Sequence, residues 1–188
     1  MNLPNKLTIL RTILIPFYLV ALLWDIIPAG RWIALAIFMF ASLTDMWDGQ
    51  IARKYNLITN FGKFMDPLAD KLLVCSAMIA FVEIGTMPAW AVIVIISREF
   101  IISGFRLIAS DKGIVIAADI WGKIKTVEQM IMICFLTADL GDFIDVSIGN
   151  MDLIMLLEDI LIYAAVVLTV ISLVNYMVKN KEVLADSK

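Results

Sequence analysis

Six long, largely apolar stretches constrain this chain more than any other feature of its sequence. A helix needs about 20 residues to cross the ~30 Å hydrocarbon layer of a bilayer, and each stretch reaches that length. The sequence therefore predicts an all-α integral membrane protein, a bundle of six transmembrane helices. The predicted spans are residues 8–28, 31–55, 62–84, 86–110, 114–140 and 153–178.

The composition also favours a lipid-exposed bundle over a soluble domain. Hydrophobic residues make up 62% of the 188 and charged residues only 18%, whereas soluble chains are nearer half apolar. The net charge of -3 is too small to indicate a nucleic-acid partner. The chain has no histidine, so acid-base chemistry must use other side chains, such as carboxylates. Cys75 and Cys134 have no metal-ligand spacing and are expected to be buried apolar side chains.

Basic residues gather on one side of the predicted spans. If the N-terminus is cytoplasmic, all 15 lysines and arginines except Arg31 fall on the inner side, as the positive-inside rule requires. We find no internal repeat and no separate soluble domain, so residues 1–188 are predicted to form a single membrane domain. The segment between spans five and six is either a cation-binding cluster or a solvated loop. Its acidic residues are Asp139, Asp142, Asp145 and Asp152.

Four aspartates at the cytoplasmic ends of spans two and three form the main candidate site. Asp45 and Asp48 are three residues apart, so they share one face of span two. Asp66 and Asp70 are four apart and share one face of span three. The short connection makes the two helices antiparallel neighbours, so the four carboxylates are expected to converge near the cytoplasmic face.

Converging carboxylates predict a metal site. They could instead pair with neighbouring cations, but four like charges at membrane depth repel one another unless they are protonated or bind cations. Carboxylate-only ligation suits hard divalent ions, Mg²⁺ or Mn²⁺, and two ions could bridge the four acids. The small residues Gly49, Ala52 and Gly62 beside the acids allow either close helix packing or the approach of a bulky ligand to the backbone.

The segment 45–70 resembles the signature of the CDP-alcohol phosphotransferase family. It reads D-x-x-D-G-x-x-A-R and, eight residues later, G-x-x-x-D-x-x-x-D. The resemblance implies a membrane enzyme with a two-metal site and a CDP-linked lipid donor, in which an alcohol attacks phosphorus and CMP leaves. The residues at the fixed positions are Asp45, Asp48, Gly49, Ala52, Arg53, Gly62, Asp66 and Asp70.

The same resemblance assigns roles to these residues. Asp45, Asp48 and Asp66 are implied metal ligands. Asp70 completes the metal site and is the candidate base that takes the proton of the alcohol. The implied CDP pocket contains Asp45 and its signature neighbours Gly49, Ala52 and Arg53, although Arg53 could be only a positive-inside anchor.

The N-terminal sequence NLPNKLTILR resembles an opening common in bacterial members of the family. By this resemblance Asn5, Thr8 and Arg11 face the nucleotide. Helix capping or anchoring at the membrane interface is an equally open interpretation.

Cations in spans four and five predict a pocket for an anionic acceptor. Arg98 lies more than a turn inside span four, where an unpaired cation is unfavourable, and its neighbour Glu99 is expected not to share its face. Arg106 lies about two turns further along. Arg98 could pair with an aspartate or with Glu128; alternatively, the cations bind a phosphate group. The proposed phosphate-binding residues are Arg98, Arg106, Lys123 and Lys125.

The segment 97–129 resembles the phosphatidylglycerophosphate synthases within the family. The matching residues are Ser97, Arg98, Glu99, Gly104, Arg106, Gly122, Lys123, Lys125, Thr126 and Gln129. The implied donor is CDP-diacylglycerol, the implied acceptor is glycerol 3-phosphate, and a homodimer is implied as well. Thr126 and Gln129 could serve hydroxyl groups of either glycerol or a sugar. Span six is predicted to be scaffold or a dimer contact, and inositol phosphate as acceptor or a cation transporter remain alternatives.

Overall fold

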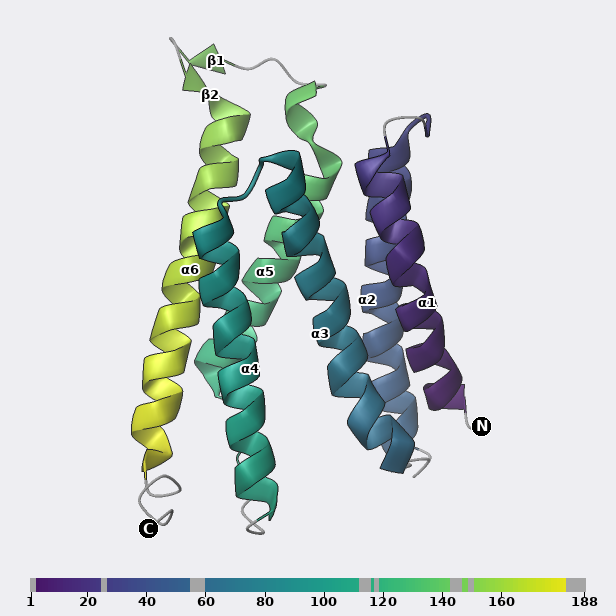
Figure 1. The fold of residues 1–188 in the computed structure, drawn as a ribbon, viewed down its shortest axis with the longest axis vertical. Helices are drawn as coiled ribbons and strands as arrows, with labels where there is room; N and C mark the ends of the chain where they lie inside the picture. The colour runs from purple at the N-terminus through teal and green to yellow at the C-terminus, as the bar shows by residue number, and fades with distance from the viewer. Residues whose placement is uncertain are drawn as a thin grey trace. The chain divides into compact units, whose positions relative to one another are not determined.

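A computed structural model describes residues 3–24, 27–54, 60–111, 116, 119–142, 147–148 and 151–181. Helices form almost all of this part of the chain (Figure 1). They are α1 (Leu3–Leu23), α2 (Gly30–Lys54), α3 (Asn60–Ile84), α4 (Ala89–Asp111), α5 (Ile120–Ala138), the 3-10 helix η1 (Leu140–Asp142) and α6 (Leu153–Lys179). Two-residue strands β1 (Ser147–Ile148) and β2 (Met151–Asp152) pair antiparallel, with Ser147 opposite Asp152.

The predicted all-helical fold is confirmed in the described residues, apart from the short β1–β2 pair. The largest shift in a boundary is at α5, which begins at Ile120 rather than at residue 114. Helix α1 begins at Leu3 rather than at residue 8. Helical hydrogen bonding continues into the polar N-terminal residues because it does not require a hydrophobic environment. The apolar pattern detects only the part of a helix that is long and hydrophobic enough to span the bilayer.

The surface and the apolar helices are those expected of a membrane protein. By length and composition, two helical segments in the described part can cross a membrane, Asn5–Leu23 and Leu153–Lys179. The apolar part of α2, Gly30–Thr44, is shorter. Large apolar side chains such as Phe17 and Ile93 are exposed, as expected for surfaces that contact lipid. The described residues thus form an all-helical membrane protein, and the number of spans stays a prediction.

The chain divides into two compact units. The first contains residues 1–86 and 133–144, and therefore α1, α2, α3 and the last turns of α5. The second contains residues 87–132 and 145–188, and therefore α4, most of α5 and α6.

In the first unit, α1 packs against α2 and α3, and α2 packs against α3. Gly30 allows the start of α2 to approach α1, because a Cβ atom there would lie 2.5 Å from the carbonyl oxygen of Ala21. One turn before Ala21, Tyr18 is fully buried and contacts the ring of Phe38. Its hydroxyl forms a hydrogen bond of 3.2 Å with Thr137 of α5.

A glycine ends α3. Gly85 has a φ of 87°, and its N–H donates to the carbonyls of Val82 at 3.2 Å and Phe81 at 3.1 Å. The N–H of Thr86 donates to the carbonyl of Phe81 at 3.0 Å. This is the Schellman arrangement, in which a left-handed residue lets the chain satisfy the last carbonyls of a helix.

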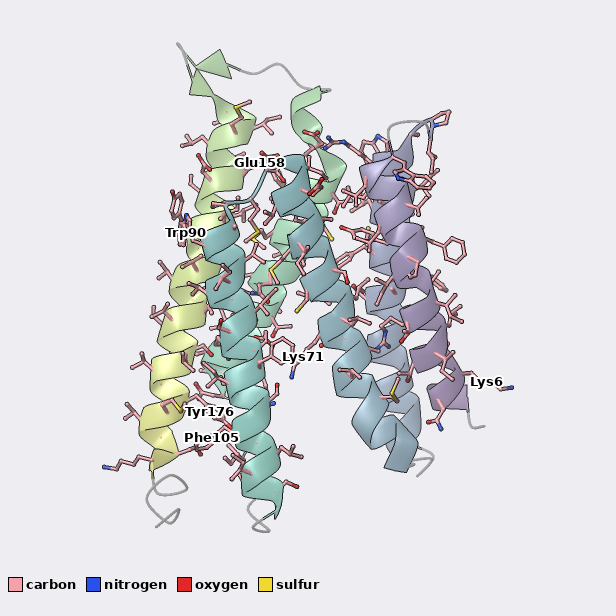
Figure 2. The ribbon with its side chains drawn as sticks, in the orientation of Figure 1. Lys6, Lys71, Trp90, Phe105, Glu158 and Tyr176 are labelled. Atoms are coloured by element: carbon pink, nitrogen blue, oxygen red, sulfur yellow. The ribbon has the colours of Figure 1, made fainter. Side chains whose placement is uncertain are left out.

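In the second unit, α4 and α6 pack side by side and run parallel. The tilted rings of Trp90 and Tyr163 contact each other in the N-terminal halves of the two helices, with centroids 6.1 Å apart. Phe105 and Tyr176 meet edge to face near their C-terminal ends, at 5.6 Å (Figure 2). These two contacts fix the direction and register of the pair.

Helix α5 runs antiparallel to α6. Asp119, directly before α5, accepts hydrogen bonds from Asn175 and from Lys179 near the end of α6, the latter at 2.6 Å. Further along α5, a Cβ atom on Gly122 would lie 3.9 Å from the hydroxyl of Ser172.

Candidate functional site

The backbone of the first unit carries both aspartate pairs at the same end of two packed helices. Asp45 and Asp48 lie near the end of α2, and Asp66 and Asp70 lie near the start of α3. Residues 55–59 join the two helices, which pack against each other and are therefore antiparallel. The helix arrangement required by the predicted metal site is thus present.

The convergence of the four carboxylates stays a prediction. Among the predicted residues of this site, only Asp70 has a described side chain, and it is partly buried. No metal-binding group of three or more acids, histidines or cysteines occurs among the side chains that the structure describes. The other predicted residues lie outside the described side chains; they are Asp45, Asp48, Gly49, Ala52, Arg53, Gly62 and Asp66.

The N-terminal residues Asn5, Thr8 and Arg11 lie on the buried face of α1. The Arg11 Nε donates to the carbonyl of Ala41 in α2 at 3.3 Å, one turn before Asp45. An anchor at the membrane interface would be exposed, whereas Arg11 is 1% exposed. The burial therefore favours the interpretation in which these residues face inward, toward the end of α2 that carries the aspartates.

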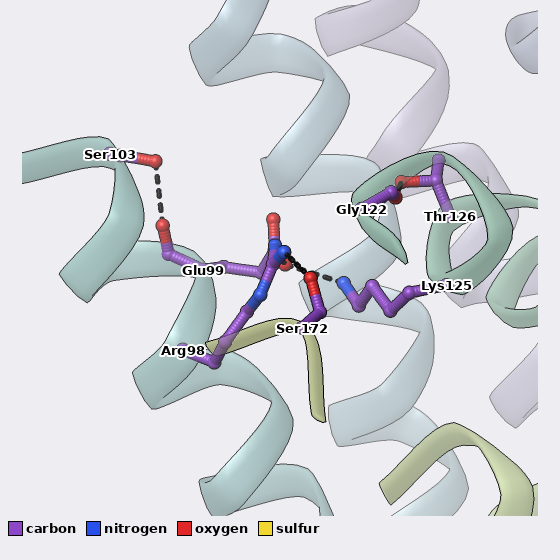
Figure 3. Close-up of polar contacts among 7 residues, drawn as sticks. All are labelled: Arg98, Glu99, Ser103, Gly122, Lys125, Thr126 and Ser172. Atoms are coloured by element: carbon purple, nitrogen blue, oxygen red, sulfur yellow. Dashed lines mark hydrogen bonds and ion pairs between the residues drawn. The ribbon is translucent and has the colours of Figure 1, made fainter. Parts of the chain in front are cut away.

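A buried network of charged and polar side chains joins three helices in the second unit (Figure 3). Arg98 Nη1 donates to Glu99 Oε1 at 2.8 Å, and Arg98 Nη2 donates to the hydroxyl of Ser172 in α6 at 2.5 Å. Lys125 Nζ of α5 donates to the same Glu99 oxygen, also at 2.5 Å. The side chains of Arg98, Glu99 and Lys125 are 9%, 17% and 2% exposed, so water screens their charges only weakly.

Arg98 pairs with Glu99, although Glu99 was expected not to share its helix face and the predicted partners were an aspartate or Glu128. Neighbouring residues leave a helix in different directions, but this rule applies to their Cβ atoms. Both side chains are long, and their charged ends bend toward each other by rotation about several bonds. Lys125 completes the arrangement from another helix, which sequence spacing along α4 could not reveal.

The network carries excess positive charge. Two cations donate to one carboxylate oxygen, so these three side chains together carry one net positive charge. The carboxylate of Glu128, one turn along α5, also interacts electrostatically with Lys125. In addition, Arg98 Nε is buried and has no hydrogen-bond partner among the described residues. The guanidinium lies against α5 at Gly122, where a Cβ atom would make an ordinary van der Waals contact of 3.5 Å with Arg98 Nη2. Such a site suits an anion that accepts several hydrogen bonds.

Only two of the four predicted phosphate-binding residues belong to this network. Arg98 and Lys125 are brought together by Glu99. The guanidinium of Arg106 instead lies over the ring of Tyr176, 5.8 Å from its centroid, and both Arg106 and Lys123 are exposed.

Sequence reasoning missed the contribution of α6. Ser172 is 1% exposed and binds Arg98, and Thr169, one turn earlier, is fully buried. Both lie in a helix that the sequence predicted to be scaffold or a dimer contact. The sequence feature that could have predicted this contribution is the spacing of the two hydroxyl residues, which are three apart in an apolar span and therefore share one helix face.

The acidic segment between α5 and α6 has one described partner. Asp139 follows α5 with a φ of 44° and forms an ion pair with Arg31 at the start of α2, within the first unit. The sequence left a cation-binding cluster and a solvated loop as alternatives for this segment, and neither describes Asp139, which pairs with Arg31. The side chains of Asp142, Asp145 and Asp152 lie outside the described residues.

Helices with buried charged side chains and exposed apolar surfaces define a membrane protein with polar functional sites. The CDP-alcohol phosphatidyltransferase family model matches residues 1–171, and the chain belongs to this family. The family resemblance of segment 45–70 is thereby confirmed.

Relatives from several bacteria are similar to the chain over nearly its whole length. A CDP-diacylglycerol--glycerol-3-phosphate 3-phosphatidyltransferase of Bacillus subtilis is 44% identical over 197 residues, covering 99% of this chain and 98% of the relative. A protein of the same name from Haemophilus influenzae is 37% identical, covering 99% and 97%. A probable phosphatidylglycerophosphate synthase of Mycobacterium tuberculosis is 36% identical, covering 95% and 81%.

Proposed function

We propose that this protein transfers the phosphatidyl group of CDP-diacylglycerol to glycerol 3-phosphate and releases CMP. The product is phosphatidylglycerol phosphate, an intermediate of phospholipid synthesis. The observation that carries the proposal is the buried network of Arg98, Glu99 and Lys125, which has one net positive charge. The names of the Bacillus and Haemophilus relatives support the same donor and acceptor.

The network explains why the acceptor should carry a phosphate. Arg98 and Lys125 share one oxygen of Glu99 at low exposure, and an anionic group beside two such buried cations is favourable. A phosphate group accepts several charge-assisted hydrogen bonds, and the planar guanidinium of Arg98 can donate two in parallel. In this proposal the acceptor's phosphate binds Arg98 and Lys125, while Glu99 and Ser172 hold their side chains in position.

The aspartates of α2 and α3 are proposed to hold two divalent ions, Mg²⁺ or Mn²⁺. The donor chemistry fits, because an all-carboxylate set binds hard cations, and the two pairs lie at the same end of packed helices. The ligands would be Asp45, Asp48, Asp66 and Asp70. Bound ions would neutralise the diphosphate and the charge that develops on the leaving oxygen.

The protein's own residues then perform the transfer. The acceptor's hydroxyl oxygen forms a bond to the phosphorus that carries diacylglycerol. The bond from this phosphorus to the bridging oxygen breaks, and CMP leaves with the electron pair. Asp70 takes the hydroxyl proton as general base, and Arg53, with the small residues Gly49 and Ala52, lines the cytidine diphosphate pocket.

The proposal includes a location and an assembly. The distribution of lysine and arginine supports a cytoplasmic N-terminus and an active site that faces the cytoplasm. Family resemblance supports a homodimer. Chemical cross-linking in native membranes tests the dimer independently of activity.

Release of CMP by the purified protein in detergent tests the function. The assay contains CDP-diacylglycerol and magnesium and compares glycerol 3-phosphate with serine, inositol and inositol phosphate. We expect release with glycerol 3-phosphate alone, with loss of activity in Asp70→Asn and on addition of a chelator. Arg98→Ala is expected to raise the KM for glycerol 3-phosphate at least about tenfold, whereas Lys181→Ala, at an exposed cation, should not change it.

The other outcomes discriminate between the alternatives. Release with inositol phosphate in place of glycerol 3-phosphate would keep the phosphate pocket and change the acceptor. Release with serine or inositol would refute the role of Arg98 and Lys125. Absence of release with every acceptor, from protein that elutes as a folded species, would refute the enzyme and leave cation transport to be tested.

A further inference from the structure

Three polar side chains close to the charged network have buried groups that no described residue satisfies. Both carboxylate oxygens of Glu128 are buried and have no hydrogen-bond partner among the described residues. The same is true of Gln129 Nε2 and Thr169 Oγ1. Gln129 is 3% exposed and Thr169 is fully buried, so these are not surface groups.

The helix register brings these side chains to one region. Helix α5 runs antiparallel to α6, and Gly122 of α5 faces Ser172 of α6. One turn along α5 leads from Gly122 to Lys125, and one turn back along α6 leads from Ser172 to Thr169. Lys125 and Thr169 are therefore at the same level of the second unit.

Glu128 and Gln129 continue the same face of α5. They follow Lys125 by three and four residues, the spacings at which helical side chains are neighbours. The polar face thus begins with the cations of the network and continues, one turn further, with a carboxylate and an amide. Thr169 of α6 lies beside this sequence of groups.

These groups match the hydrogen bonding of an alcohol. Buried polar groups in proteins are almost always satisfied, and a group of unsatisfied donors and acceptors in one place indicates a ligand of complementary polarity. The Glu128 carboxylate accepts hydrogen bonds, Gln129 Nε2 donates, and Thr169 does either. A hydroxyl group both donates and accepts, whereas an acyl chain does neither and a phosphate would be repelled by Glu128.

We propose that Glu128, Gln129 and Thr169 bind the non-reacting hydroxyl of a short polyol phosphate. This inference rests on the proposed function and adds a specificity-determining residue to it, Glu128. Opposite charges at the two ends of the polar face orient the acceptor. Its phosphate binds Arg98 and Lys125, and the hydroxyl that does not attack donates to the Glu128 carboxylate.

A substrate analogue that lacks one hydroxyl tests the inference. 3-Hydroxypropyl phosphate keeps the phosphate and the primary hydroxyl of glycerol 3-phosphate but has no secondary hydroxyl. The measured quantity is the ratio of kcat/KM for glycerol 3-phosphate to kcat/KM for the analogue. We expect a ratio of about 10 to 100 for the wild-type protein, the range for a hydrogen bond to a charged group, and a ratio within about threefold of one for Glu128→Ala.

Further variants separate binding from folding. Glu128→Gln keeps the shape and one acceptor oxygen, so its ratio should lie between those of the wild type and Glu128→Ala. The KM for CDP-diacylglycerol should be unchanged in both variants. Glu83→Gln, an exposed glutamate of α3, is the matched control and should keep the wild-type ratio.

Each result is decisive for one of the two proposals. Activity with glycerol 3-phosphate and an unchanged ratio in folded Glu128→Gln would overturn the present inference and leave the proposed function intact. A wild-type ratio near one would also overturn it. No CMP release with glycerol 3-phosphate from the wild-type protein would refute the proposed function, and this inference with it.

Discussion

Neutralising Glu99 should destabilise the protein strongly, because this carboxylate is shared by two buried cations. In Glu99→Gln the shape of the side chain is kept, but Arg98 and Lys125 lose their common negative partner. The charge of the network rises from one net positive charge to two. Removing one partner of a buried ion pair costs about 3–5 kcal/mol, and the exposures of 9% and 2% for the two cations justify the use of this range.

A second substitution should restore part of the loss. In Lys125→Met the carboxylate still accepts from Arg98, so we expect a smaller destabilisation of about 1–3 kcal/mol. The double variant returns the network to one positive charge. Its destabilisation should be less than the sum of the two single effects by about 1–3 kcal/mol, as found for residues that interact directly.

Thermal unfolding in detergent, followed by loss of the monodisperse species on size exclusion, measures these effects. For a chain of this length, about 1 kcal/mol corresponds to a shift in Tm of about 2–4 °C. Glu99→Gln should therefore lower Tm by about 6–20 °C, and Glu83→Gln should leave it unchanged. A Glu99→Gln protein within about 2 °C of the wild type, or strictly additive single effects, would show that the three charges do not form an interdependent network.

Three further predictions concern packing and charge. Gly30→Ala should lower the free energy of unfolding by about 1–3 kcal/mol through overpacking. Gly104→Ala, with open space around the site, should instead raise the free energy of unfolding by about 0.5–1 kcal/mol. The change in Tm measures both effects. Tyr18→Phe should lower the free energy of unfolding by only about 0.5–1.5 kcal/mol, because Thr137 still donates to a backbone carbonyl. A decrease above about 3 kcal/mol would contradict this prediction. Arg106→Ala should raise the KM for glycerol 3-phosphate less than about threefold, since its guanidinium packs on an aromatic ring. A tenfold increase would show that Arg106 contributes to binding the phosphate of the acceptor.

Local patterns were sufficient to predict most of the helices. A run of apolar residues long enough to span lipid has few alternatives to a helix, because every backbone polar group must be satisfied within the segment. The helix ends were predicted where glycine and proline interrupt the pattern, as at Gly85 and Pro88. The start of α1 was missed because polar residues continue that helix beyond its apolar part.

Contacts between helices were not predictable in the same way. The contact of Arg98 with Glu99 depends on side-chain rotation, and the contacts with Lys125 and Ser172 depend on how α5 and α6 pack against α4. The role of Arg106 also changed, because Tyr176 is distant in sequence and its ring is available only in the folded unit.

The sequence by itself determined the helical membrane class, the family signature from Asp45 to Asp70, and the presence of cations deep in two helices. These features depend on hydrophobicity and on spacing within one helix, which the chain carries locally. Only the tertiary structure decided which cations share a carboxylate and that α6 contributes Ser172 to their network. The reason is physical: hydrogen bonds between helices depend on register and rotation, and these are set by the packing of the whole unit.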